Sequence, residues 1–423
     1  MAKLAPTELP VDVVGTLIDA DAEVEKSEGR APKPPAEEQR GRLHRAREAM
    51  AAHGLDALLV YGSATANADP IRYLAGYVHV FPGASSLLLL PLERDPILLI
   101  DQPWHVAEAG RMSWIGDVRS FPNPDRRWLA DELQATLGAA LADVGVERGR
   151  IGIFAGTTPA VYRDVLGVTG PAAALADGSA VWQDLVAAPS AYDAAMIRRA
   201  AAVADEGMAA AVETAGAGVP EYEVCLESLR RMASLGAEFL HGSGMTTHVN
   251  IGSFSEAISN VRPFLFSTRA LERGQMFWLD LSASYAGCYV DTDRTLSVGE
   301  PSSRQRELYA VAAEMYGVLL ENARAGVTGG ELWERATDVA RAAGYGDYSN
   351  HVYLGHTTGI TTSSRPVVAR GETAELRAGS FLNVEPGIFV PGVGSACIEN
   401  TLQITGEGAA AINGFGIGIH VVE

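Results

Sequence analysis

The sequence predicts two domains: an α/β domain in the N-terminal half and an α+β domain with an antiparallel sheet in the C-terminal half. Three observations lead to this expectation. A chain of 423 residues is longer than most single domains. Before about residue 190, short apolar runs alternate with helical patterns, as in α/β domains. Beyond that point, long helical patterns surround two β-hairpins, which is typical of an α+β fold.

The N-terminal domain is expected over residues 36–190, after a polar, proline-containing arm over residues 1–35. A helix is predicted from Glu37 and is closed by Gly54. The apolar runs LDALLVYG, ASSLLLLPL and DPILLID predict strands buried on both faces, and IGIFAG predicts a further strand. Another helical pattern runs from Asp131 to Ala142. The glycines form no GxGxxG motif, so nucleotide binding is not expected.

The C-terminal domain is expected over residues 191–423, and it opens with an alanine-rich helix over Ser190–Ala215. A second helix is predicted after Pro220. Two more helical patterns, within residues 302–326 and 329–344, carry apolar stripes. Such stripes predict helices that pack on the outside of a sheet.

Composition narrows the possible partners and the compartment. A net charge of −19 argues against nucleic acid or an anionic membrane as a partner, because both attract basic surfaces. The N-terminus shows no signal-peptide pattern, and no apolar run approaches the ~20 residues that span a bilayer. The three cysteines are widely spaced and form no CxxC motif, so a reducing cytoplasm without disulfides is expected.

The first hairpin carries two acids in an apolar setting. The runs QMFWLDLSAS and CYVDTDRTLSV flank a turn at residues 285–287. If the turn is centred between Tyr285 and Ala286, Asp280 and Asp291 lie opposite each other across the two strands. Two buried carboxylates side by side would repel strongly, so a bound cation is expected to compensate them.

A second hairpin repeats this arrangement near the C-terminus. Glu385 and Glu399 are equidistant from Gly392, which lies in the turn-forming run PGVG. Between the hairpins, His356 is framed by glycines in YLGHTTGI. Four carboxylates and one imidazole suit Mn, Fe, Co or Zn. One cation would leave much of the negative charge uncompensated, so two divalent metal ions bridged by carboxylates are expected.

The order of these motifs resembles the pita-bread metallohydrolases, which include methionine aminopeptidase, aminopeptidase P, prolidase and creatinase. The resemblance is strong over residues 190–423 and weaker before them. It implies a curved antiparallel sheet backed by helices, a creatinase-like N-terminal domain and a homodimer. It also implies the ligand roles: one metal on Asp280, the other on His356 and Glu385, and bridges from Asp291 and Glu399.

Three departures from the peptidases of this family concern the substrate. A histidine that precedes the first metal strand aligns near Asn260, a second histidine aligns with Ser363, and an arginine aligns with Cys397. The metal ligands are thus kept while the groups that hold a prolyl peptide are largely replaced. The resemblance therefore implies a hydrolase that cleaves a C–N bond in a small amide, cyclic amidine or dipeptide-like molecule.

The resemblance also suggests catalytic groups. Glu385 is in the family's position for a general base, which would take a proton from water and pass it to the leaving nitrogen. His351 or His248 could stabilise the anion that forms, although His351 fits a surface or supporting position equally well. His241 lies in the same loop as His248 and is the weaker candidate.

Three further side chains are candidates for contact with the substrate, and a fourth could support the metal ligands. Arg262 and Arg365 could bind a carboxylate through paired hydrogen bonds, and Asn260 could contact the substrate. A solvated surface position suits the two arginines, His248 and His241 at least as well. Asp293 shares a strand face with Asp291 and could orient a ligand or add one. A true Xaa-Pro peptidase, a metal-dependent lyase and a non-catalytic binding protein remain the alternative functions.

Overall fold

The computed structural model describes ten stretches of the chain, and residues 1–32, which include most of the expected arm, lie outside them. The described stretches are residues 33–63, 67–79, 84–101, 103–121, 130–154, 167, 174–239, 247–252, 267–349 and 352–423. Among them the chain forms two compact units, which divide between Tyr192 and Asp193 near the start of a long helix.

The N-terminal unit is built on one mixed sheet with the strand order β4-β3-β2-β1-β5-β6. Strand β2 pairs antiparallel with β1 and with β3, and the remaining pairs are parallel. Almost every residue of β1, β2 and β3 is buried, as the apolar runs predict. The strands are β1 (Ala57–Ser63), β2 (Ser85–Pro91), β3 (Ile97–Ile100), β4 (Asp117–Ser120), β5 (Arg150–Ile153) and β6 (Ala174–Asp177).

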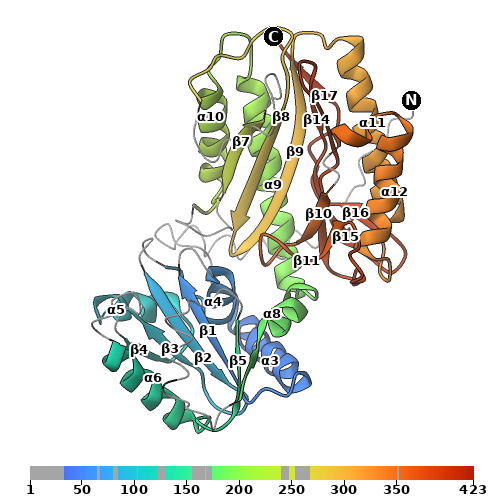
Figure 1. Ribbon diagram of the computed structural model, residues 1–423. Helices are drawn as coiled ribbons and strands as arrows, with labels where there is room; N and C mark the ends of the chain where they lie inside the picture. The colour runs from blue at the N-terminus through green and yellow to red at the C-terminus, as the bar shows by residue number, and fades with distance from the viewer. Residues whose placement is uncertain are drawn as a thin grey trace. The chain divides into compact units, whose positions relative to one another are not determined.

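Helices cover both faces of this sheet (Figure 1). Leu137 and Leu141 of α6 pack on the apolar side chains of one face. Helix α3 packs against α8 beside the other face, and Gly54 follows α3 with a φ of +64°, as its predicted end requires. The helices are α3 (Ala36–Ala52), α4 (Ala68–Ala75), α5 (Pro103–Met112), α6 (Ala130–Val144) and α8 (Ser179–Val186).

The C-terminal unit opens with α9 (Ala191–Thr214) and α10 (Glu221–Ser234), close to their predicted positions, and contains two larger sheets and a two-stranded ribbon. The strand orders are β17-β9-β8-β7, β11-β10-β12-β15-β16 and β13-β14, and every pair except β17–β9 is antiparallel. The bounds are β7 (His248–Gly252), β8 (Met276–Tyr285), β9 (Cys288–Val298), β10 (Tyr353–Thr358), β11 (Ser364–Ala369), β12 (Phe381–Val384), β13 (Gly387–Val390), β14 (Gly394–Cys397), β15 (Asn400–Ile404), β16 (Ala409–Ala411) and β17 (Ile419–Val422).

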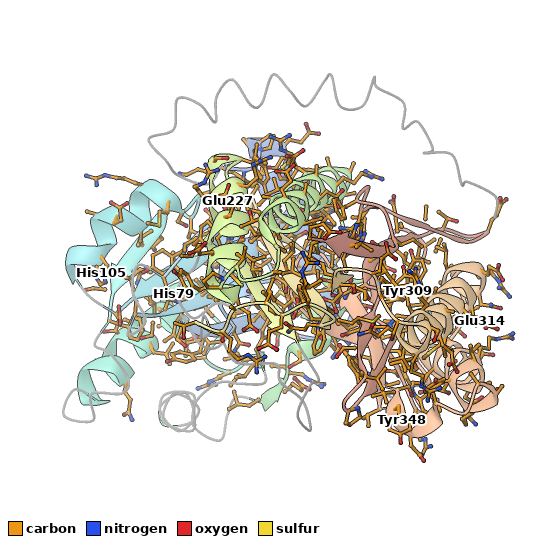
Figure 2. The ribbon with its side chains drawn as sticks, turned by 90° about the horizontal axis from the view of Figure 1, so that it is seen from above. His79, His105, Glu227, Tyr309, Glu314 and Tyr348 are labelled. Atoms are coloured by element: carbon orange, nitrogen blue, oxygen red, sulfur yellow. The ribbon has the colours of Figure 1, made fainter. Side chains whose placement is uncertain are left out.

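Helices α11 (Ser303–Asn322) and α12 (Gly329–Ala342) lie side by side against these strands (Figure 1). Each begins with a capping box, formed by Ser302 with Gln305 and by Thr328 with Glu331. Figure 2 shows the two sides of α11, with Glu314 on the outer edge and Tyr309 closer to the strands.

The inner faces of these two helices pack on the sheets, so the predicted stripes are core positions. The core includes Leu308, Met315, Leu319, Leu332, Trp333, Leu354, Leu382, Ile388 and Leu402. Within the described stretches, none of the helices combines the length and the apolar character needed to cross a membrane.

Candidate metal centre

Strands β8 and β9 bring three acids to one sheet face. Asp280 lies opposite Asp293, and Asp291 lies opposite Ser282. The predicted direct pairing of Asp280 with Asp291 is therefore wrong by two residues. Because residues two apart on a strand share a face, Asp280 and Asp291 are instead diagonal neighbours on the same face.

The turn explains the difference in register. Tyr285 pairs with Cys288, so the connection is a two-residue turn centred between Ala286 and Gly287, one residue later than expected. Ala286 has a φ of +51° and Gly287 a φ of +79°, and positive φ at both central residues is the requirement of a type I′ turn. A shift of one residue in the turn centre moves the pairing by two.

The second hairpin has the predicted register. Ladders β13–β14 and β12–β15 are both symmetric about Gly392, and Val384 pairs with Asn400. Glu385 and Glu399 lie between the two ladders, where the strand pairing is interrupted. Such an interruption leaves room for side chains to turn toward a shared ligand.

The oxygen atoms of three predicted ligands converge. One carboxylate oxygen each from Asp280, Asp291 and Glu399 lies within 4.8 Å of the others. Strand β9 holds the backbone of Glu399 in place. The Glu399 N–H donates to the Asp293 carbonyl at 3.2 Å, and the Glu399 carbonyl accepts from the Thr292 hydroxyl at 3.0 Å. Residues more than 100 positions apart in the chain thus form one cluster.

Glu385 belongs to the same electrostatic group. Its N–H donates to the Leu354 carbonyl at 3.0 Å, which fixes the backbone beside β10. Burial raises the pKa of Glu385 well above its usual range, and the charges of Asp293 and Asp280 raise it further. Burial and acidic neighbours have the same effect on the pKa of Asp291 and of Glu399.

His356 lies on β10 opposite Asn383, whose amide donates to the Glu399 carboxylate. The histidine is only 7% exposed, and burial lowers its pKa to about 4, so the ring is neutral near pH 7. Its Nδ1 lies 3.3 Å from the Thr357 carbonyl. A proton on Nδ1 would leave the Nε2 lone pair available for a metal, as in many metal-binding histidines.

The residues present fit a cation. Oδ1 of Asp291 and Oδ1 of Asp293 are buried and have no hydrogen-bond partner among the described residues. An oxygen-rich set with one imidazole suits hard and borderline divalent ions. A cation would satisfy these oxygens and remove the repulsion between the acids.

Two tyrosines near the cluster were not among the sequence candidates. The hydroxyl of Tyr289 donates to Oδ2 of Asp291 at 2.9 Å. The ring of Tyr353 stacks on His356 with centroids 5.9 Å apart, and its hydroxyl is 3.4 Å from Oγ of Ser363. Burial raises the pKa of both phenols, so both stay protonated. The two-residue spacing from Tyr289 to Asp291 is a strand-face signal that could have identified the first.

Two other predicted site residues lie in the described part of the chain. Arg365 on β11 forms two hydrogen bonds to Glu372, at 2.9 and 2.5 Å, so this guanidinium already has a carboxylate partner within the protein. This pairing favours a structural role over the predicted contact with substrate. The backbone of His248 lies on β7 opposite Ser282, which is itself opposite Asp291.

The remaining candidates lie outside the described residues. These are Asn260, Arg262 and His351, together with His241, so their predicted roles stay predictions.

Two family comparisons cover most of the described chain. Residues 195–406 match Peptidase_M24, metallopeptidase family M24. Residues 42–185 match the Creatinase/Prolidase N-terminal domain.

Individual relatives carry related names. A protein named Xaa-Pro dipeptidase from Pyrococcus horikoshii is 33% identical over 214 residues, which is 51% of this chain and 59% of the relative. Another Xaa-Pro dipeptidase, from Lactobacillus helveticus, is 34% identical over 138 residues, 33% of this chain and 37% of that protein. The chain thus spans about three fifths or less of the length of these curated relatives.

Solved structures extend the likeness to both units. The prolidase from Pyrococcus horikoshii has a TM-score of 0.73 and 25% identity, covering 90% of this chain and 99% of that one. An X-Pro aminopeptidase from Thermotoga maritima has a TM-score of 0.77 at 22% identity, covering 90% and 99%, and supports the fold alone. The predicted pita-bread fold and family are confirmed: this chain belongs to metallopeptidase family M24, with a creatinase/prolidase-type N-terminal domain.

Proposed function

We propose that this chain is a hydrolase that uses two divalent metal ions to cleave a C–N bond in a small, amino-acid-derived substrate. The observation that carries the proposal is the convergence of Asp280, Asp291 and Glu399 within 4.8 Å, with Glu399 buried and the two aspartates half-buried. Membership of a metallopeptidase family supports the reaction class. The names of the Xaa-Pro dipeptidases among the relatives support a small peptide-like substrate.

The metal ions would be held by the five predicted ligands, Asp280, Asp291, His356, Glu385 and Glu399. When bound, two ions of Mn, Fe, Co or Zn would polarise the scissile carbonyl or amidine carbon and make a water molecule more acidic. Glu385 receives the proton from that water and passes it to the leaving nitrogen. Tyr289 and Asn383 donate to Asp291 and Glu399, and so hold these carboxylates in position.

The anion that forms during hydrolysis needs hydrogen-bond donors, and carboxylates cannot supply them. Tyr353 supplies one, because its protonated phenol lies close enough to Glu385, Glu399 and Asp291 for their charges to raise its pKa. His351 and His248 are the donors that the sequence suggests, and the backbone of His248 is two strands from Asp291 in the same cross-strand row.

A true Xaa-Pro dipeptidase is the second candidate, favoured by the names of the 33% and 34% identical relatives. Against it stand Asn260, Ser363 and Cys397, the positions where the sequence departs from the pattern of the peptidases that it resembles. The site keeps its acids but offers different groups to a substrate. A homodimer and a cytoplasmic location, both expected from the sequence, belong to the same proposal, and light scattering of the purified protein tests the first.

The test compares substrates with and without metal. Chelator-treated protein is supplied with Mn²⁺ and incubated with Xaa-Pro dipeptides, with other dipeptides and amides, and with cyclic amidines, and the products are identified by mass spectrometry. Metal-dependent cleavage of the non-prolyl compounds is expected, with ¹⁸O from labelled water in the product. Cleavage of Xaa-Pro dipeptides alone would favour the second candidate. A product without ¹⁸O would indicate a lyase, and activity without metal would contradict both.

Asp291→Asn is the inactive control, because it removes a proposed ligand with little change in volume. Asp101→Asn is its matched partner. Asp101 is a buried acid, 2% exposed, whose Oδ2 accepts from the Ser85 N–H at 3.0 Å, and it is not among the proposed ligands. This variant is expected to keep full metal-dependent activity.

A further inference from the structure

Asp293 is an acid of the metal strand that the five-ligand set does not use. It lies directly opposite Asp280 in the β8–β9 ladder, and residues in that position have Cβ atoms about 4.5–5.5 Å apart. It is 4% exposed, and its Oδ1 has no hydrogen-bond partner among the described residues. A buried carboxylate oxygen without a donor costs free energy unless something satisfies it.

The carboxylate of Asp293 lies close to the other acids of the cluster. Among the charged neighbours that raise the pKa of Glu385, Asp293 has the largest effect, and the same is true of the pKa of Glu399. The backbone of Asp293 is fixed as well, because its carbonyl accepts from the Glu399 N–H at 3.2 Å and from the Arg294 guanidinium at 2.7 Å. The side chain therefore lies beside the proposed ligands and has little freedom to leave.

The charge of Arg294 lowers the pKa of Asp293, but the guanidinium forms no ion pair with this carboxylate. Its guanidinium donates to backbone carbonyls, including those of Glu399 and Phe415, and to the side chains of Asn400 and Thr292. Adjacent residues on a strand also point to opposite faces. In the described part of the chain, no basic side chain forms an ion pair with Asp293. The carboxylate makes side-chain hydrogen bonds with Glu399 and Cys397, but its Oδ1 has no partner, so this oxygen is available to a cation in the cluster.

We propose that Asp293 is a sixth metal ligand, so that five carboxylates and one imidazole hold the metal ions. This inference rests on the proposed function, because it needs the metal centre to exist. Five carboxylates facing two divalent cations leave one net negative charge, whereas four would balance them. The additional hard oxygen favours ions that accept high coordination numbers and oxygen ligands, such as Mn²⁺, over tetrahedral Zn²⁺.

The test measures metal binding rather than turnover. Wild-type protein, Asp293→Asn and the control Asp101→Asn are stripped with a chelator and titrated with Mn²⁺, and free Mn²⁺ is followed by its electron paramagnetic resonance signal. Asp293→Asn is expected to bind Mn²⁺ at least about tenfold more weakly, while the control matches the wild type. The ratio of Mn²⁺ to Zn²⁺ affinity should also fall in Asp293→Asn alone.

A crystal structure of the Mn²⁺-loaded wild-type protein separates a ligand from a supporting residue and needs no variant. The inference expects an Asp293 oxygen within about 2.6 Å of a metal ion. An Asp293 oxygen beyond bonding distance, or unchanged affinity in Asp293→Asn, overturns the sixth ligand but leaves the proposed function intact. Wild-type protein that binds no Mn²⁺ and no Zn²⁺ overturns both.

Discussion

Removing the metal should make the stability of the C-terminal unit fall as pH rises from 5 to 8. Without a cation, burial and the charge of Asp280 raise the pKa of Asp293 from 3.8 to about 8. In the unfolded chain the same carboxyl group loses its proton near pH 4. Between these values the native state binds more protons than the unfolded state, and stability then decreases with increasing pH.

The size of the effect follows from that difference. About four pKa units correspond to roughly 5–6 kcal/mol if no relaxation occurs. Water that enters the metal-free cluster and small movements of the acids reduce this to about 2–3 kcal/mol. For a unit of this size, that difference lowers the melting temperature by roughly 5–10 °C.

Thermal unfolding of chelated and Mn²⁺-loaded protein at several pH values tests the reasoning. The melting temperature of the chelated protein should fall from pH 5 to pH 8, and the increase that Mn²⁺ causes should grow over the same range, because metal binding requires ionised acids. Asp293→Asn should reduce the slope of the chelated protein. If the melting temperature of the chelated protein stays constant or rises with pH, ionisation of the acids does not destabilise the folded state and the prediction is wrong.

Three further predictions address single contacts. Asp291→Ala should lose bound metal and at least about 100-fold in activity while its circular dichroism spectrum is unchanged, and a variant with full activity would refute the ligand assignment. Tyr353→Phe should keep its metal content but lose roughly 100-fold in kcat, measured with the substrate found in the screen, and an unchanged kcat would remove the phenol from the mechanism. Glu372→Gln should lower the free energy of unfolding by about 1–2 kcal/mol in urea at pH 7, a value discounted because its partner Arg365 is largely exposed. Arg365 lowers the pKa of Glu372 from 4.5 to about 2, so this stabilisation is present above pH 4.5 and is lost as pH falls toward 2. A difference in unfolding free energy between wild type and Glu372→Gln that persists at pH 2 would contradict this prediction.

The helices of the C-terminal unit follow from local sequence. Helix α9 is rich in alanine, and α11 and α12 begin with capping residues and carry regular apolar stripes. The shorter helices α4, α5 and α8 were not predicted. Helices of 8 to 10 residues gain little from their own hydrogen bonds, so they form where tertiary packing covers them.

The first hairpin of the acid cluster has a register that its local sequence pattern leaves open. The alternation of side chains places Asp280 and Asp291 on one face for either turn centre. The sequence therefore predicts the shared face but does not distinguish two registers that differ by two residues. The left-handed backbone at Ala286 and Gly287 decides between them, and it brings Asp293 opposite Asp280.

The sequence by itself determined the family, the fold class and the acids that converge, because these depend on residue type and short-range periodicity. Tertiary structure decided which atoms meet. Backbone hydrogen bonds of Glu399 with Asp293 and Thr292 of β9 place its carboxylate beside Asp280 and Asp291, more than 100 residues earlier in the chain. Contacts between residues far apart in the chain depend on how strands and sheets pack, which local patterns do not encode.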